Sequence, residues 1–386
     1  MQDYIILRKT AASPGGARSV EMFGASAKAD LLVTERLSES DAASIEKEPE
    51  VDQIAPSMPT RLIEPVAGEA AGEAASWGLT ATGAETSPFN GAGVNVAVLD
   101  TGIDAAHPAF AGVNLVIKDF SGDGDGDRQG HGTHCAGTVF GRGTTPRIGV
   151  APGVSRALIG KVLRDNGSGD SAMIFRGLQW AADQGANIIS MSLGFDFPAM
   201  VKRRTDAGYP ADLATSDTLE IYRANLRMFD RIMAVLQANA GFGGAPLVIA
   251  AAGNASRRRE NPEWRIAAGL PAAADGVLSV AALGQHEGAF VVAPFSNSRA
   301  SLCAPGVDIL SAAIGGGLRS LSGTSMACPH VAGLAALWWE AVRKSGITPT
   351  PTNVQARLLA ALRRERLAPK FLEIDFGQGM AVAPSA

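Results

Sequence analysis

The strongest constraint on the fold is a series of short apolar runs that alternates with stretches of helical periodicity from Trp77 onward. Runs without polar interruption are typical of strands buried on both faces, and such strands belong to parallel sheets that helices cover on either side. The intervening stretches, residues 171–183 and 218–238, repeat apolar side chains every three or four positions, as one buried helix face does. The sequence therefore predicts an α/β fold. Its predicted strands are residues 94–99, 157–162, 186–191, 247–251 and 277–281.

Length and composition restrict the class of protein. A chain of 386 residues with 46% apolar and 19% charged side chains is long enough for a large globular domain and a small one. No apolar run approaches the about 18 residues that a membrane span needs. The net charge of −4 and the absence of a basic stripe argue against nucleic acid as a partner. We therefore expect neither nucleic acid nor a membrane among the partners.

The first 70 residues are predicted to form a separate small α+β unit. Short β-like runs occur at residues 4–7, 20–23, 31–34, 51–54 and 61–63. A helix running to Lys47 is expected to begin at Ser38, which stands at capping-box spacing from Asp41. Residues 65–76, rich in Ala, Gly and Glu, are predicted to be an exposed linker. The expected organisation is a unit over 1–70, a linker over 71–76 and a large domain over 77–386.

The residues that begin this sequence do not resemble a signal peptide. They lack a basic start, a long apolar segment and a small-residue cleavage site. A cytoplasmic location is the expectation, and secretion is the alternative if a leader has been trimmed away.

Four polar side chains stand where apolar segments begin or end, and together they could perform nucleophilic catalysis. Ser325 opens an apolar run that is predicted to be a helix, whose positive N-terminal end favours developing negative charge. An attacking serine also needs a base, a group that orients the base, and a donor for the oxyanion. His131 could supply the base, Asp100 the orienting carboxylate and Asn254 the amide donor.

These four segments, in the order Asp, His, Asn, Ser, resemble the subtilisin family of serine peptidases. The resemblance implies that Ser325 attacks a peptide carbonyl to form an acyl-enzyme, that His131 transfers the proton and that Asp100 orients His131. It gives Asn254 and the Ser325 backbone N–H to the oxyanion hole. The expected function is a serine endopeptidase acting on polypeptides. The alternative is a catalytically silent scaffold of the same fold that binds peptides.

The family resemblance also gives the N-terminal unit a role. It implies an inhibitory propeptide that acts in cis and that the enzyme cuts from itself, with the cut expected between Glu64 and Trp77. A small unrelated α+β domain is the alternative interpretation.

Substrate-binding residues follow from the same resemblance. Two segments match the family strands that pair with an extended peptide, and main-chain pairing of this kind supplies affinity while side-chain pockets supply specificity. Gly269 matches the back of the pocket for the residue before the cleaved bond, which implies room for a large apolar side chain. The basic run 257–259 either draws acidic residues to the rim or is a solvated charge run. The two matching segments are Gly167, Ser168 and Gly169, and Ser192, Leu193 and Gly194.

An acidic loop before His131 is a candidate calcium site, because alternating carboxylates are suitable ligands for Ca²⁺. It is not an EF-hand, since the twelfth loop position counted from Asp123 is His134. The resemblance requires no cofactor. The alternative to calcium is a solvated acidic turn. The four carboxylates are Asp119, Asp123, Asp125 and Asp127.

Five further side chains that often carry chemistry are predicted to be structural. The three cysteines lie in apolar or glycine-rich surroundings without metal-site spacing and are expected to be free buried thiols. His134 follows His131 by three residues, but no carboxylate or cysteine completes a metal-ligand set, and His330 is expected to be structural as well. These residues are Cys135, Cys303, Cys328, His134 and His330.

The segment between Gly194 and Asn254 is longer than the family core requires. The surplus, residues 195–218, is expected to be a loop or lid beside the cleft, or else surface decoration.

Overall fold

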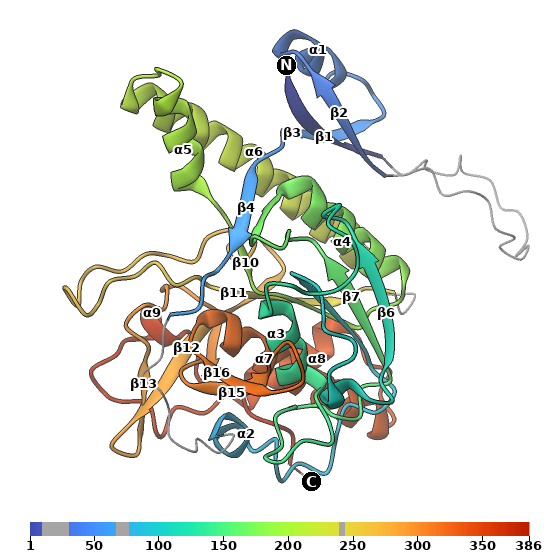
Figure 1. The fold of residues 1–386 in the computed structure, drawn as a ribbon, viewed down its shortest axis with the longest axis vertical. Coiled ribbons are helices and arrows are strands. Elements are labelled where there is room, and N and C mark those ends of the chain that lie inside the picture. The colour runs from blue at the N-terminus through green and yellow to red at the C-terminus, as the bar shows by residue number, and fades with distance from the viewer. Residues whose placement is uncertain (10–30, 67–76, 239–243, 386) are drawn as a thin grey trace, which may run out of the picture. The chain divides into compact units, whose positions relative to one another are not determined.

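The computed structural model describes residues 1–9, 31–66, 77–238 and 244–385 (Figure 1). It contains two compact units. The first combines Met1–Met58 with Phe197–Arg231, and the second combines Pro59–Asp196 with Ile232–Ala386. In the part of the chain that is described, no helix is both long and apolar enough to cross a membrane.

A mostly parallel sheet forms the centre of the second unit, which confirms the predicted α/β class. Its order is β13-β12-β11-β9-β5-β7-β6, with β14 also paired to β12 and only β13 antiparallel to its neighbour among these described strands. All five predicted strands are present; 247–251 has the predicted ends, and the ends of the other four are shifted. The strands are β5 (Asn95–Asp100), β6 (Asn114–Asp119), β7 (Arg156–Lys161), β9 (Ile188–Met191), β11 (Leu247–Ala251), β12 (Val277–His286), β13 (Ala289–Val292) and β14 (Leu302–Pro305).

Helices flank this sheet because their apolar faces are buried in the same core as the strands. The helix α3 (His131–Phe140) lies against α7 (Thr324–Lys344), and α4 (Ser171–Asp183) begins and ends where the sequence predicts (Figure 1). Both α3 and α7 contribute buried side chains to one large apolar cluster together with the central strands. The remaining elements here are α2 (Trp77–Thr82), η1 (Pro108–Phe110), α8 (Pro351–Ala360), α9 (Glu373–Phe376) and the hairpin of β15 (Ile309–Ala312) and β16 (Leu318–Leu321).

A second, three-stranded sheet in this unit contains a strand that the sequence assigns to the N-terminal domain. β4 (Pro59–Leu62) lies between β8 (Ser168–Asp170) and β10 (Leu193–Phe195) and is antiparallel to both. Its central place gives the backbone of β4 partners on both edges.

The first unit has a small sheet of order β2-β1-β3, formed by β1 (Gln2–Arg8), β2 (Leu32–Leu37) and β3 (Val51–Pro56). The helix α1 (Glu39–Ile45) packs on it through Ala42. Its predicted capping box is confirmed, because Ser38 Oγ accepts from Asp41 N and Asp41 accepts from Ser38 N. The predicted strand at 20–23 and most of the predicted linker lie outside the described residues.

Residues 197–218 of the surplus segment belong to the first unit, and the prediction of a loop is wrong. Two helices, α5 (Phe197–Asp206) and α6 (Ala211–Ala238), occupy it. Buried side chains recur every three or four positions along α6, and this face extends upstream of the helix predicted from residue 218. The helix joins the N-terminal strands through polar contacts: Asn225 Nδ2 donates to Pro56 O (2.8 Å), and Arg231 pairs with Asp52 (2.6 Å).

Candidate active site

The structure brings Asp100, His131 and Ser325 together at the carboxyl edge of the central sheet. Asp100 is the last residue of β5, His131 is the first residue of α3, and Ser325 lies in the first turn of α7. His131 Nδ1 lies 2.8 Å from Asp100 Oδ1, and all three side chains are buried. His131 Nε2 has no hydrogen-bond partner among the described residues. The ring is thus held on its Nδ1 side while the other nitrogen stays available for proton transfer.

Asp127 holds the strand end and the helix start in this arrangement. One of its oxygens accepts from Thr101 Oγ1 (3.0 Å) and Gly130 N (2.7 Å), and the other accepts from Thr133 N (2.9 Å) and Thr133 Oγ1 (2.6 Å). Thr101 Oγ1 in turn accepts from Gly132 N (2.9 Å). A buried carboxylate with several donors is rigid, so this network connects the neighbour of Asp100 to the helix that begins with His131. Sequence reasoning missed this role and assigned Asp127 to calcium.

Close backbone contact reinforces the same junction. A Cβ built at Gly132 would lie 2.2 Å from Gly102 O, so α3 can approach the β5 turn only with glycine at this position.

Asn254 follows β11 and presents an oriented amide. Its Oδ1 accepts from Thr324 N and from Thr324 Oγ1, both at 2.9 Å. These contacts identify Nδ2 as the amide nitrogen, and Nδ2 donates to Glu64 O (2.9 Å). The amide donor is therefore fixed beside the first turn of α7, where a peptide carbonyl is bound.

The chain itself supplies the extended peptide beside Ser325. Thr60 pairs with Gly169, and Arg61 pairs with Gly194 and Ser168. A Cβ at Gly169 would lie 2.8 Å from Thr60 Oγ1, so glycine is needed for this close approach. The two predicted substrate strands thus lie on either side of β4.

The next two residues reach the nucleophile. Ser325 Oγ donates to Ile63 O (3.2 Å) and lies 3.4 Å from Ser192 O. A Cβ built at Gly194 would lie 3.6 Å from Ile63 Cγ1, so this glycine borders the Ile63 side chain. Leu270, which follows Gly269, accepts a hydrogen bond from Phe195 N (3.1 Å) and so places its segment beside β10.

Comparison with known proteins agrees with this geometry. The Subtilase family matches residues 91–380. The chain is 35% identical over 256 residues to an intracellular serine protease of Paenibacillus polymyxa, covering 64% of this chain and 67% of that protein. It is also 35% identical over 258 residues to subtilisin DY of Bacillus licheniformis, covering 64% and 77%. It is 34% identical over 280 residues to proteinase R of Parengyodontium album. That match covers 68% of this chain and 59% of proteinase R, so less than two thirds of that relative is matched.

The chain belongs to the subtilase family. It is a subtilisin-like serine endopeptidase.

Three of the four carboxylates in the acidic loop of the subtilase, Asp119, Asp123 and Asp127, accept hydrogen bonds from the chain itself. Burial acts to raise the pKa of Asp119, but hydrogen bonds from Ser121, Gly124 and Gly122 outweigh it and lower that pKa below its ordinary value. Asp123 accepts from a backbone N–H (2.8 Å), and Asp127 is occupied as described above.

Lys161 adds a cation beside this loop. Its Nζ donates to Gly126 O (3.2 Å), Thr101 O (2.8 Å) and Asp165. Among the described residues the four loop carboxylates do not gather into a metal-ligand set. The side-chain arrangement therefore does not fit a calcium ion held by all four.

One described group of potential metal ligands exists, and it is the Asp100–His131 pair with Cys135. Burial, with the nearby Asp100 charge, raises the pKa of Cys135 well above its ordinary value, which disfavours the thiolate that metals bind. All three cysteines are free and buried, as predicted.

His134 and His330 occupy structural positions. His134 Nε2 lies 3.0 Å from Ile309 O, and burial together with the charge of nearby His131 lowers the pKa of His134 to about 3. His330 Nδ1 lies 2.8 Å from Met326 O, and burial lowers its pKa to about 4.

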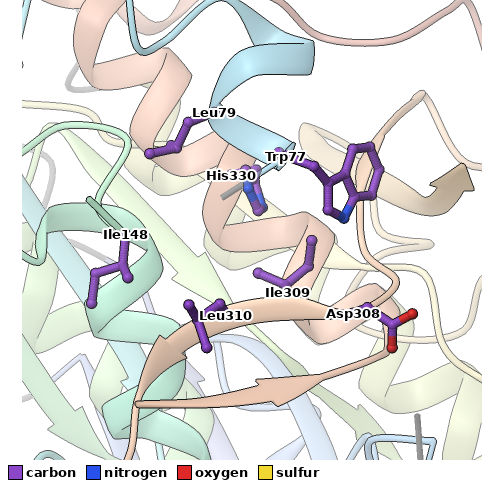
Figure 2. A pocket seen from close by; sticks show the side chains of 8 residues that line it. Trp77, Leu79, Ile148, Asp308, Ile309, Leu310 and His330 are labelled. Atoms are coloured by element: carbon purple, nitrogen blue, oxygen red, sulfur yellow. The ribbon is translucent and has the colours of Figure 1, made fainter. Parts of the chain in front are cut away.

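Figure 2 shows His330 beside Trp77 and Leu79, at a cavity of about 10 Å³. Such a volume holds about one water molecule and no substrate.

The basic run near Asn254 has one member that is not available to substrate. Arg258 Nη2 donates to Asp375 Oδ1 (2.8 Å), and both side chains are 6% exposed. Arg258 also contacts Ser296 O. The flanking Arg257 and Arg259 are exposed.

Proposed function

We propose that the subtilase hydrolyses peptide bonds through Asp100, His131 and Ser325, and that its N-terminal residues act as a propeptide in cis. The observation that carries this proposal is the strand β4 in the cleft, which leads Ile63 O to within 3.2 Å of Ser325 Oγ. A polypeptide already bound between the two edge strands identifies the ligand class of the cleft.

The reaction follows from the positions of the side chains. Ser325 Oγ attacks the carbonyl carbon while His131 Nε2 takes its proton, and Asp100 stabilises the resulting imidazolium through Nδ1–H. Asn254 Nδ2 and the Ser325 backbone N–H stabilise the oxyanion. Collapse breaks the C–N bond, and His131 returns the proton to the leaving amine. Water then hydrolyses the acyl-enzyme with the same proton transfers in the same order.

The bound segment has the features of an inhibitor. The register places Ile63 at the nucleophile, but Asn254 donates to the next carbonyl, Glu64 O (2.9 Å), and Ser325 Oγ donates to Ile63 O. Val66 N donates to Ser322 O (2.8 Å), which anchors the chain beyond this point. The oxyanion donor and the nucleophile thus contact different residues, and a bond bound in this way is cut slowly.

The strand register and the contact of Ser325 Oγ with Ile63 O support Ile63–Glu64 as the processing bond, directly before the interval predicted from the sequence. Intact-mass spectrometry tests it: wild-type protein should lose residues 1–63, whereas Ser325→Ala should remain full length. The released fragment should inhibit the enzyme when added back. A wild-type protein that stays uncut and is fully active would show that these residues are not a propeptide.

A scaffold that binds peptides without cleaving them is the competing function. The two are separated by a fluorophosphonate probe, which should label Ser325 in the processed protein and leave Ser325→Ala unlabelled. Absence of label in processed, folded protein would favour the scaffold.

The location in the cell remains a proposal. We propose the cytoplasm, with support from the relative that is named an intracellular serine protease. The test is to fractionate cells that produce this protein naturally and to detect it with an antibody. Accumulation of the protein in the medium would contradict a cytoplasmic location.

A further inference from the structure

The strand β4 presents its side chains to two different surroundings. Thr60 and Leu62 point to one face and are almost fully buried, at 2% and 1% exposed. Arg61 points to the other face, and its side chain is 57% exposed. The cleft therefore encloses the side chains at two positions and leaves the position between them in contact with solvent and the rim.

Carboxylates lie on the same face as Arg61, one on each neighbouring strand. Arg61 is directly opposite Gly194 on β10 and Ser168 on β8. Two residues further along, Asp196 and Asp170 share that face, because side chains alternate along a strand. Asp196 N also donates to Pro59 O (3.0 Å), which extends the pairing beyond β10 and fixes the Asp196 backbone.

The two carboxylates lie beside different cations. Asp170 accepts from Met173 N (3.1 Å) at the start of α4 and lies 3.7 Å from Arg164 Nη2, so it serves as a helix cap with its own cation. Asp196 Oδ2 lies 3.5 Å from Arg61 Nη1, and the Asp196 side chain is only 12% exposed. A carboxylate so far withdrawn from water interacts more strongly with a cation than an exposed one does.

We propose that Asp196 is a specificity-determining residue that selects a cationic side chain at the third position before the cleaved bond, where Arg61 lies. This inference rests on the proposed peptidase function and names its substrate class. The preferred sequences carry Arg or Lys at that position, followed by two aliphatic residues that occupy the places of Leu62 and Ile63. An acidic side chain at the third position would face Asp196 and be rejected by like-charge repulsion.

The expected effect is moderate, because the cation itself remains partly solvated. Ion pairs with an exposed partner contribute little binding free energy. That small contribution corresponds to a roughly two- to fivefold preference in kcat/KM for Arg over Gln. The preference should decrease as salt is raised from 0.01 to 1 M, because screening weakens such pairs over that range.

The experiment uses processed enzyme and peptides of the form Thr-X-Leu-Ile, with X as Arg, Lys, Gln or Glu before the cut. For wild-type enzyme, kcat/KM should be highest with Arg or Lys at X, lower with Gln and lowest with Glu. Asp196→Asn should bring the Arg-to-Gln ratio to about one, and Asp196→Lys should invert it, while Asp196→Glu should retain it. The matched control is Asp206→Asn, which removes an exposed carboxylate paired with Lys202 in α5 and should leave all ratios unchanged.

Each outcome has a distinct meaning. The specificity proposal is overturned if wild-type enzyme shows no preference at X, or if Asp196→Asn keeps the salt-dependent Arg-to-Gln ratio of wild type. In either case, continued peptide cleavage leaves the proposed function intact. Failure to cleave any peptide, together with no fluorophosphonate label at Ser325, overturns the proposed function instead. Variants are compared at equal labelled active-site concentration, so a partly unfolded variant does not mimic a change of preference.

Discussion

The two units of the subtilase differ in what holds their functional parts in place. In the second unit Asp100, His131 and Ser325 stand on elements that share one large apolar cluster, with strand side chains such as Val96 and Ile159 fully buried. The first unit has a small cluster in which α1 packs on the sheet. Polar contacts from α6 to β3 support that unit. A catalytic site built on a large core is rigid, whereas a small unit with few internal contacts is more sensitive to single substitutions.

Ser325→Ala should produce the largest change, the loss of peptide hydrolysis, because it removes the nucleophile and nothing else. The melting temperature should stay near that of unprocessed wild type, since the large core is untouched. Hydrolysis rates and thermal melts measure the two effects. Substantial turnover by a pure sample would remove Ser325 from its catalytic role.

Asn254→Ala should lower kcat by roughly 10²–10³, the figure known for the oxyanion asparagine of subtilisin, with a much smaller change in KM. The reason is that its amide acts on the developing oxyanion. Steady-state kinetics on one peptide decides the matter. An effect confined to KM would make Asn254 a substrate-positioning residue.

Asn225→Ala tests the weaker unit. Asn225 is fully buried and its side chain donates to Pro56 O and Ile221 O, so its loss removes the side-chain donor that contacts β3. We expect the inhibition constant of the added-back N-terminal fragment to rise roughly tenfold, which corresponds to one buried hydrogen bond. Peptide hydrolysis without the fragment should not change. If inhibition is as tight as in wild type, α6 does not contribute to holding the N-terminal unit.

Acid should destabilise the second unit through its buried histidines. Their folded pKa values, about 4 for His330 and about 3 for His134, lie below the unfolded value of about 6.5. Below pH 6.5 the unfolded chain therefore binds more protons, and stability falls as pH decreases toward 4 for His330 and 3 for His134. In melting curves from pH 7 to 4, His330→Gln should show a smaller slope than wild type. Equal slopes would contradict the contribution of His330.

The smallest effect is expected from calcium in the acidic loop. A calcium ion bound only to the folded chain would raise the melting temperature by mass action. Because Asp119, Asp123 and Asp127 already accept hydrogen bonds from the chain and Lys161 contributes a cation there, we expect little difference between EDTA and millimolar calcium. A clear increase in calcium would show that the loop rearranges to bind it.

The sequence determined the features that depend on neighbouring residues. Continuous apolar runs specified the parallel sheet, because a strand without polar positions has to be buried on both faces. The spacing of Ser38 and Asp41 specified the capping box of α1, since the cap needs only residues one turn apart. The order of the four motifs indicated which residues to examine at the carboxyl edge of the sheet.

Tertiary structure decided the features whose partners lie far apart in the chain. The strand β4 joins β8 and β10 because their open edges supply its hydrogen bonds, and no local pattern encodes that choice. Asp127 serves the His131 helix because folding brings Thr101 and Thr133 to it, although alternating carboxylates predict a metal. The same is true of Asp196, whose carboxylate meets Arg61 across two strands separated by more than a hundred residues of chain. Long-range contacts of this kind are specified by the packed core as a whole and not by the spacing of any motif.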